Sequence, residues 1–218
     1  MTLRRIALVP LIGAALLNAG CGGGTTASTA DNGSCAHATQ PAAHAPPKLK
    51  PPVARLDPSK HWTLKFATSC GTFVVSLKPR TSPRAAASLV ALARRGYFDG
   101  TVFHRIVPGF VIQGGDPTQS GSGGPGYTTV DPPRTNTRYL RGIVAMAKTG
   151  TEPRGAAGSQ FFVVTADAPS LPPDYAVVGR VASGLGVVEK IGELGDATDP
   201  NGAPTQTVVV EHVTIAAR

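Results

Sequence analysis

The sequence predicts a mainly β protein, built as a closed eight-stranded antiparallel barrel capped by two α-helices. Short apolar runs are separated by clusters of glycine, proline and aspartate, which is typical of strands joined by tight turns. Two further segments place their apolar residues at helical spacing instead. The chain has 218 residues, of which 41% are hydrophobic, so it can bury one good core.

The elements can be assigned in order along the chain. A hairpin over 62–77 comes first, because apolar and polar residues alternate on both sides of a Thr-Ser-Cys-Gly turn. A helix follows, since Ser82 and Pro83 form a typical N-cap and first turn and Gly96 is a typical end. A second helix is predicted over Leu185–Leu194, where apolar side chains share one face. The eight strands are predicted at 62–66, 72–77, 102–107, 110–113, 143–147, 161–165, 176–181 and 207–215.

The N-terminal region has the composition of an export signal. Arg4 and Arg5 precede an apolar run from Ile6 to Leu17, which is too short to span a bilayer but long enough for the core of a signal peptide. We therefore expect residues 1–20 to be a signal peptide and the protein to be exported.

Cys21 follows two small residues, as in bacterial lipoprotein signals, where such a cysteine is lipidated and becomes the mature N-terminus. Asn18 departs from that pattern, because the signal usually has leucine three residues before the cysteine. Two outcomes stay open. The protein is either anchored by a lipid at Cys21 to the extracytoplasmic face of the cell membrane, or cleaved at an ordinary site and secreted.

Residues 21–60 consist largely of glycine, threonine, serine, alanine and proline, with almost no large apolar side chain. Such a segment buries too little surface to offset its ordering entropy, so we predict a flexible tether before a folded domain at 61–218. Export places thiols in an oxidising compartment, and we expect Cys35 and Cys70 to form a disulfide. The alternative is that Cys70 is a turn residue and Cys35 is unpaired.

Residues 103–116, Phe-His-Arg-Ile-Val-Pro-Gly-Phe-Val-Ile-Gln-Gly-Gly-Asp, carry the clearest chemical signal. If the apolar runs on either side of the Pro-Gly turn are strands, Arg105, Phe110 and Gln113 converge on one small surface. An arginine within an apolar strand needs a partner or an open cleft, because burying an unpaired charge is costly. A guanidinium, a phenyl ring and a carboxamide at this spacing suit a peptide that contains proline.

This motif resembles the signature of the cyclophilin family of peptidyl-prolyl isomerases. The runs 142–147 and 158–163 are similar to that family's other two pocket-lining strands, and the resemblance extends from about His61 to the C-terminus. It implies the cyclophilin-like capped barrel. It also implies an enzyme that accelerates rotation about X-Pro bonds in unfolded or flexible polypeptides, with no cofactor and no metal.

The resemblance also implies the role of each site residue. Arg105 is the expected catalytic residue, since a charged donor aimed at the amide nitrogen stabilises the twisted amide more than the planar one. Gln113 is expected to hold the substrate backbone, with Ala147 and Gln160 forming the wall beside it. His104 matches the family's histidine next to the arginine, and we expect it to be a hydrogen-bonded core residue. The apolar floor for the pyrrolidine ring is expected to consist of Phe110, Val111, Phe162 and Leu171.

Three positions differ from the best-known eukaryotic members of the family. Lys148 stands in place of an asparagine, so one backbone contact to the substrate is lost or replaced. Tyr175 replaces a histidine at the pocket rim, and Ser170 replaces the tryptophan associated with tight cyclosporin binding. We therefore expect weak inhibition by cyclosporin.

Other classes of function have less support. The formal charge of +8 is scattered rather than clustered, so we expect no nucleic-acid partner. The loop 121–126 has the spacing of a dinucleotide-binding fingerprint, but Pro125 prevents a helix from starting there. The leading hypothesis is a monomeric, exported peptidyl-prolyl isomerase. The alternatives are a catalytically idle cyclophilin-like module that binds proline-containing segments of an envelope partner and, with least support, an adhesin or solute-binding lipoprotein.

Overall fold

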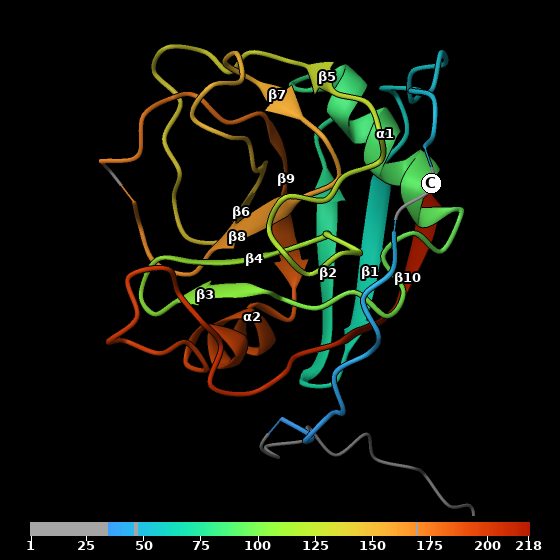
Figure 1. The fold of residues 1–218 in the computed structure, drawn as a ribbon. Helices are drawn as coiled ribbons and strands as arrows, with labels where there is room; N and C mark the ends of the chain where they lie inside the picture. The colour runs from blue at the N-terminus through green and yellow to red at the C-terminus, as the bar shows by residue number, and fades with distance from the viewer. Residues whose placement is uncertain (1–34, 46–47, 169) are drawn as a thin grey trace, which may run out of the picture. The chain divides into compact units, whose positions relative to one another are not determined.

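The computed structural model describes residues 35–45, 48–168 and 170–218, and its main feature is a strongly curled sheet (Figure 1). The sheet contains β1 (Trp62–Thr68), β2 (Gly71–Leu77), β3 (Arg105–Val107), β4 (Val111–Gly114), β6 (Ile143–Met146), β8 (Phe161–Val164), β9 (Val177–Ser183) and β10 (Val210–Ala217). These eight strands are all antiparallel and lie in the order β10-β1-β2-β9-β6-β8-β4-β3.

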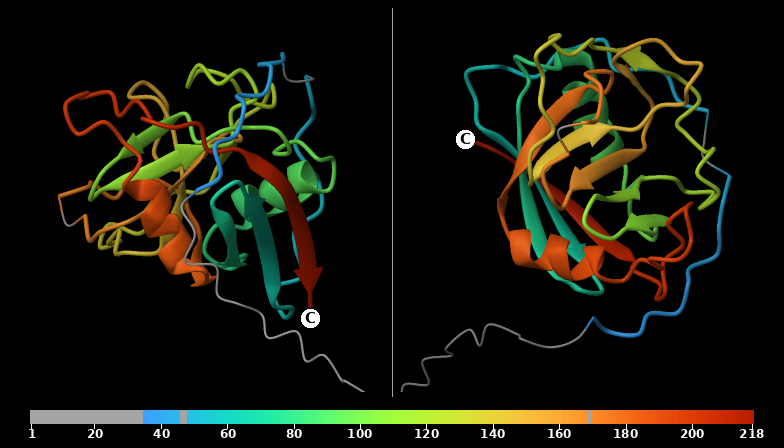
Figure 2. Two further views of the ribbon diagram at one scale, coloured as in Figure 1. Left: turned by 90° about the horizontal axis from the view of Figure 1, so that it is seen from below. Right: turned by 90° about the vertical axis from the view of Figure 1, so that its left-hand side faces the viewer.

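The two predicted helices are confirmed, with earlier ends than expected. They are α1 (Pro83–Ala93) and α2 (Leu185–Gly192), and they lie at opposite ends of the barrel (Figures 1 and 2). Two short strands that the sequence did not predict, β5 (Thr129–Val130) and β7 (Ala156–Ala157), pair with each other in a separate sheet. Among the described residues, no helix is both long enough and apolar enough to cross a membrane.

The barrel has an open seam, so the expectation of strict closure is wrong, while the eight antiparallel strands and two caps are confirmed. In the described chain the edge strands β3 and β10 do not pair with each other. One isolated bridge between Val102 and Val209 spans the seam. The reason is that β3 has only three residues, and Ile106 donates its backbone N–H to Gly202 O, 2.8 Å away, in the loop before β10.

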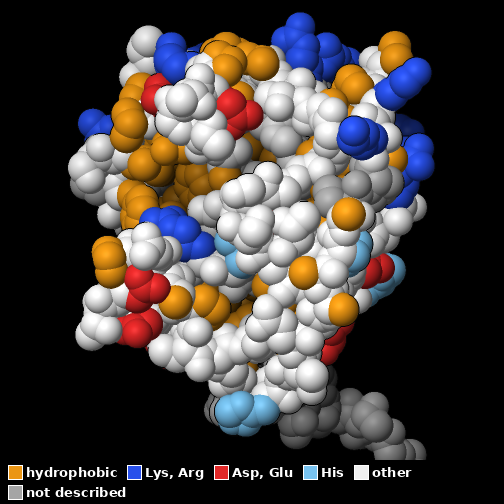
Figure 3. All heavy atoms as spheres, viewed as in Figure 1, with side chains coloured by type: hydrophobic (Ala, Val, Ile, Leu, Met, Phe, Trp, Pro, Cys, Tyr) orange, Lys and Arg blue, Asp and Glu red, His pale blue; other side chains and the backbone are white. Residues whose placement is uncertain are grey.

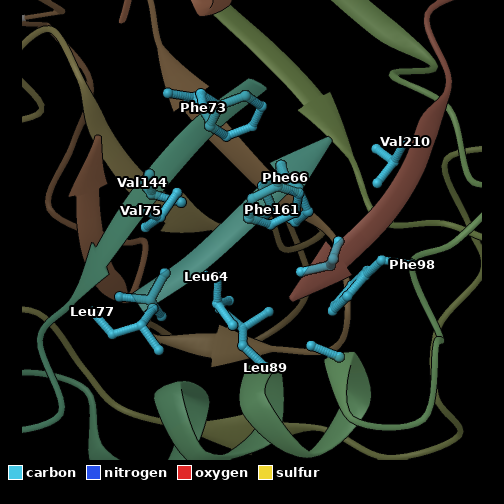
Figure 4. Close-up of a cluster of buried hydrophobic side chains, with 14 of the residues drawn as sticks. Leu64, Phe66, Phe73, Val75, Leu77, Leu89, Phe98, Val144, Phe161 and Val210 are labelled. Carbon is cyan, nitrogen blue, oxygen red and sulfur yellow. The ribbon is translucent and has the colours of Figure 1, made fainter. Parts of the chain in front are cut away.

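The core contains a cluster of phenyl rings inside the barrel. Phe66 and Phe73, from neighbouring strands, stack with ring centroids 4.9 Å apart, and the ring centroid of Phe161 lies 5.2 Å from that of Phe66. Leu89 of α1 reaches Leu64 of β1, so the helix covers the end of the cluster (Figure 4). Each such side chain contributes about 1.5–3 kcal/mol through burial, which holds the sheet curved around it.

The segment before β1 differs from the flexible tether that the sequence predicted. We call residues 35–45 and 48–60 the strap, because this segment runs along the outside of the domain (Figures 1 and 2). The predicted Cys35–Cys70 disulfide is present and fixes one end of the strap. Near the other end Leu56 is buried, and Trp62 Nε1 donates to Asp57 O at 2.9 Å.

The folded unit therefore begins just before Cys35 and not at His61. A polar, proline-rich composition predicts little burial, but long-range backbone hydrogen bonds and a disulfide order the strap without a large apolar surface. The predicted signal peptide at 1–20, Cys21 and the first part of the predicted tether lie outside the described residues.

A carboxylate from a distant loop caps the start of α1. Ser82 occupies the predicted N-cap position, but its hydroxyl donates to Val177 O at 2.8 Å and not to a helix group. Asp131 Oδ2 instead accepts hydrogen bonds from the backbone N–H groups of Arg84 and Ala85, both at 2.7 Å. A buried negative charge at the N-terminus of a helix satisfies free donors and complements the helix dipole.

Replacing Asp131 with alanine should leave two N–H groups of α1 without an acceptor. We expect the free energy of unfolding to fall by about 1–3 kcal/mol in urea titrations. Arg84→Ala is the matched control, because it keeps the cap and removes only two exposed contacts of the guanidinium, the 3.7 Å ion pair with Asp131 and the 3.1 Å hydrogen bond to Val130 O, so it should change stability by less than about 0.5 kcal/mol. Equal losses in the two variants would show that the ion pair, and not the cap, stabilises the helix.

Candidate active site

Strand register places the predicted catalytic residues side by side. The hairpin of β3 and β4 pairs Arg105 with Gln113, and β4 pairs Gln113 with Phe162 of β8. Directly paired residues point to the same face of a sheet, so the guanidinium, the carboxamide and the phenyl ring share one face. The Pro-Gly turn that sets this register is present, with Gly109 at φ +68°.

A small apolar cavity of about 260 Å³ opens on this face, beside Arg105, Gln113 and Lys148. Figure 3 shows a hollow lined by hydrophobic side chains with a Lys or Arg side chain at its edge, over the β3, β4 and β8 side of the molecule. The structure brings the whole predicted apolar floor together here, with the predicted rim residue. The apolar lining consists of Phe110, Val111, Phe162, Leu171 and Tyr175.

The protein binds the Nε end of the Arg105 side chain and leaves its terminal nitrogens free. Its Nε donates to Asn201 O at 3.1 Å, and Gly202 lies so close that a Cβ there would come within 3.2 Å of Arg105 Cγ. In the described part of the chain the two terminal nitrogens of Arg105 donate no hydrogen bond. The guanidinium is therefore oriented while keeping donors available for a ligand.

Gln113 is the first group in a series of hydrogen bonds that extends from the apolar cavity to the loop 121–128. Its Nε2 donates to Gln160 Oε1 at 3.0 Å, and Gln160 Nε2 donates to Gly123 O at 3.0 Å. These bonds leave Gln113 Oε1 without a partner among the described residues, so it can accept from a peptide N–H. A second cavity of about 440 Å³ is lined by Ala147, Gln160 and the loop 121–128, and it shares Gln113 and Lys148 with the first.

His104 lies beneath this loop, outside the lining of both cavities. Neither ring nitrogen has a well-formed partner in the described residues, although the Gln160 side chain and the Val102 backbone lie nearby. Burial lowers the pKa of His104 below its ordinary 6.5, and the charge of Asp116 opposes this shift only in part. The fold therefore favours the neutral ring.

The ammonium group of Lys148 donates hydrogen bonds to the loop that contains it. Its Nζ donates to Thr149 O at 3.1 Å and to Glu152 O at 3.2 Å, and it lies 5.7 Å from the ring centroid of Tyr175. Lys148 therefore offers no free donor that could replace the substrate contact expected from an asparagine at this position. Ser170 is exposed, beside residue 169, which lies outside the described residues.

Tyr139 is a site residue that the sequence did not reveal. It is fully buried behind the cavity, where its hydroxyl donates to Tyr175 O at 2.8 Å and accepts from Tyr175 N at 2.9 Å. Its ring and that of Tyr175 both contact Phe162, with centroids 6.3 and 5.3 Å away. Burial raises the pKa of Tyr139 to about 12. Tyr139 therefore fixes the backbone of the pocket rim from behind.

These features define a class of protein. A capped antiparallel barrel carries an oriented arginine with free donors, a small apolar cavity and a carboxamide on one face, which is the site of a peptidyl-prolyl isomerase. The family model for "Cyclophilin type peptidyl-prolyl cis-trans isomerase/CLD" matches residues 63–215, and the chain belongs to this family. The resemblance noted in the sequence is confirmed, and with it the enzyme class, peptidyl-prolyl cis-trans isomerase (EC 5.2.1.8).

Known proteins similar to the chain come from bacteria and eukaryotes. It is 36% identical over 172 residues to peptidyl-prolyl cis-trans isomerase A of Mycobacterium tuberculosis, covering 71% of this chain and 92% of that protein. It is 38% identical over 131 residues to peptidyl-prolyl cis-trans isomerase-like 1 of Gibberella zeae, covering 57% and 78% respectively.

A solved structure with the same fold is the cyclophilin type peptidyl-prolyl cis-trans isomerase of Cryptosporidium parvum. Its crystal structure has a TM-score of 0.65 at 28% identity and covers 72% of this chain and 99% of that one. A second crystal structure of the same protein, in the presence of the dipeptide Ala-Pro, has a TM-score of 0.64 at 29% identity, with the same coverage.

The buried ring of His104 should make stability depend on pH. The unfolded ring titrates near 6.5 and the folded ring lower, so between these pH values the unfolded state binds more protons. The His104 contribution to stability is therefore complete above pH 6.5 and is lost as pH falls through the folded pKa.

The check is urea unfolding of wild type and His104→Gln from pH 8 to pH 5. We expect the difference in unfolding free energy to be constant above pH 6.5 and to shrink below it. A difference that stays constant over the whole range would contradict this account of the ring.

Proposed function

We propose that this isomerase accelerates X-Pro rotation in exported proteins and assists their folding at the outer side of the membrane, where a lipid on Cys21 anchors it. The catalytic part of this proposal rests on one observation: the free terminal nitrogens of Arg105 lie beside an apolar cavity. Its substrates are proline-containing segments of unfolded or flexible polypeptides, and it acts as a monomer without a nucleic-acid partner.

The reaction needs a twisted amide to be stabilised, and no bond has to be broken. Resonance gives the X-Pro bond a rotation barrier of roughly 18–20 kcal/mol. The apolar cavity receives the pyrrolidine ring and excludes water, and Gln113 Oε1 holds the peptide backbone. A terminal nitrogen of Arg105 donates to the proline nitrogen as its lone pair returns during rotation. A thousandfold acceleration requires about 4 kcal/mol of preferential stabilisation, which one oriented charged donor in a partly dry site can supply.

The proposal of export rests on the N-terminal sequence and on the disulfide. Arg4, Arg5 and the apolar run 6–17 form the pattern of a signal peptide, and Cys21 follows at the place of a lipidation site. The Cys35–Cys70 disulfide supports the same location, because structural disulfides persist in oxidising compartments.

The catalytic proposal is tested by measuring the cis-to-trans rate of an Ala-Pro peptide with wild type, Arg105→Ala and Arg105→Lys. We expect wild type to accelerate rotation, Arg105→Ala to lose about 10²–10³-fold in kcat/KM, and Arg105→Lys to lie between them. Arg95→Ala is the control, because Arg95 is an exposed arginine just after α1. If wild type binds the peptide without accelerating rotation, the protein is a catalytically idle binding module.

The anchoring proposal is tested by fractionating bacterial cells that express the full chain. We expect wild type in the membrane fraction, extractable with detergent, and Cys21→Ser in the soluble extracytoplasmic fraction or the medium. Wild type that is already soluble outside the cytoplasm would show that the signal is cleaved at an ordinary site and that the protein is secreted.

A further inference from the structure

The strap contacts the active site through one loop. We call residues 116–126 the glycine-rich loop, part of which lines the larger cavity. The backbone N–H of His44 donates to Pro117 O at 3.1 Å, and that of Leu49 donates to Pro125 O at 2.8 Å. The strap therefore holds this loop near both of its ends.

Gln119 makes a third contact, at the tip of the loop. Its Oε1 accepts from Gln40 and its Nε2 donates to Pro41 O at 2.9 Å, so both ends of its carboxamide are bound by the strap. Gln119 has φ +59°, the only positive φ of a non-glycine residue in the described chain. Such a conformation is unfavourable for glutamine and persists only where surrounding contacts impose it. The strap supplies those contacts.

The position of the glycine-rich loop sets the orientation of the Gln160 and Gln113 carboxamides through a series of hydrogen bonds. Gly123 N donates to Asp116 Oδ2 at 3.0 Å, and Asp116 is completely buried. Burial alone would raise the pKa of Asp116, but hydrogen bonds from Thr118 and Gly123 outweigh it and lower the pKa. The ionised carboxylate thus fixes Gly123, whose carbonyl accepts from Gln160, which in turn accepts from Gln113.

We propose that the strap is a positioning element of the active site. It holds the glycine-rich loop where Gly123 orients Gln160 and Gln113, and the Cys35–Cys70 disulfide keeps the strap in place. The inference rests on the proposed function and assigns to the N-terminal segment a role in substrate binding beyond that of a tether. Without the strap, a loop rich in glycine samples many conformations, and ordering it on binding raises KM.

The first test uses the full oxidised chain and the variant Gln119→Gly. Glycine accepts φ +59° without strain, so the variant removes the two side-chain hydrogen bonds between Gln119 and the strap while the fold and the backbone hydrogen bonds of the strap to Pro117 and Pro125 are kept. We expect KM and the Kd for an Ala-Pro peptide to rise by about threefold to tenfold, with kcat within about twofold of wild type. A merely structural role would lower the melting temperature and leave the ratio of KM to kcat unchanged.

Gln206→Ala is the matched control for this variant. Gln206 Nε2 donates to Cys35 O at 3.3 Å and to Ala36 O at 3.1 Å, so the change removes strap contacts that lie outside the glycine-rich loop. KM and Kd should stay at their wild-type values. An equal rise in both variants would overturn the assignment to Gln119.

The second test releases the end of the strap. The double variant Cys35→Ser/Cys70→Ser should show the same rise in KM and Kd as Gln119→Gly, and reductant should raise both for wild type but not for the double variant. Wild-type values in both Gln119→Gly and the double variant overturn the proposal. Because Kd is measured as well as KM, the two proposals can fail separately. A wild type that binds the peptide but does not catalyse rotation refutes only the proposed isomerase function. A wild type that neither binds nor catalyses refutes both the proposed function and the role of the strap.

Discussion

The active site depends on the register between β3 and β4. Pairing of Arg105 with Gln113, and of Gln113 with Phe162, places charge, carboxamide and ring on one face. The next residues along the hairpin, Ile106 and Ile112, pair with each other and are fully buried on the opposite face. A slip of one residue would exchange the two faces, placing apolar side chains at the site and Arg105 against the core. The Pro-Gly turn therefore determines the chemistry as well as the fold.

The open seam of the barrel leaves room for the loop that orients Arg105, the proposed catalytic residue. Because β3 is an edge strand, the loop before β10 satisfies its free backbone, through Gly202 O, and the same loop binds Arg105 Nε through Asn201 O. A fully paired central strand would have left no room for that loop. The seam thus holds the stem of the guanidinium while its terminal nitrogens stay available at the cavity.

The sequence predicted the eight strands of the barrel, the two helices and the residues of the apolar cavity, because alternating patterns and the 103–116 motif are local signals. It did not predict features created by contacts between distant segments. Tyr139 stands outside any motif, and only the fold shows that its hydroxyl holds the backbone of Tyr175. The capping of α1 by Asp131 and the ordering of the strap are equally non-local, and composition alone wrongly favoured a flexible segment after Cys35.

In the proposed function, the apolar cavity binds proline while Arg105 donates to the rotating amide. The most direct measurement is a crystal structure of the oxidised protein with a short peptide that contains Ala-Pro. We expect the pyrrolidine ring between Phe110 and Phe162, a terminal nitrogen of Arg105 facing the proline nitrogen, and Gln113 on the peptide backbone. A proline bound outside this cavity, or an Arg105 whose terminal nitrogens contact only protein groups, would contradict the account.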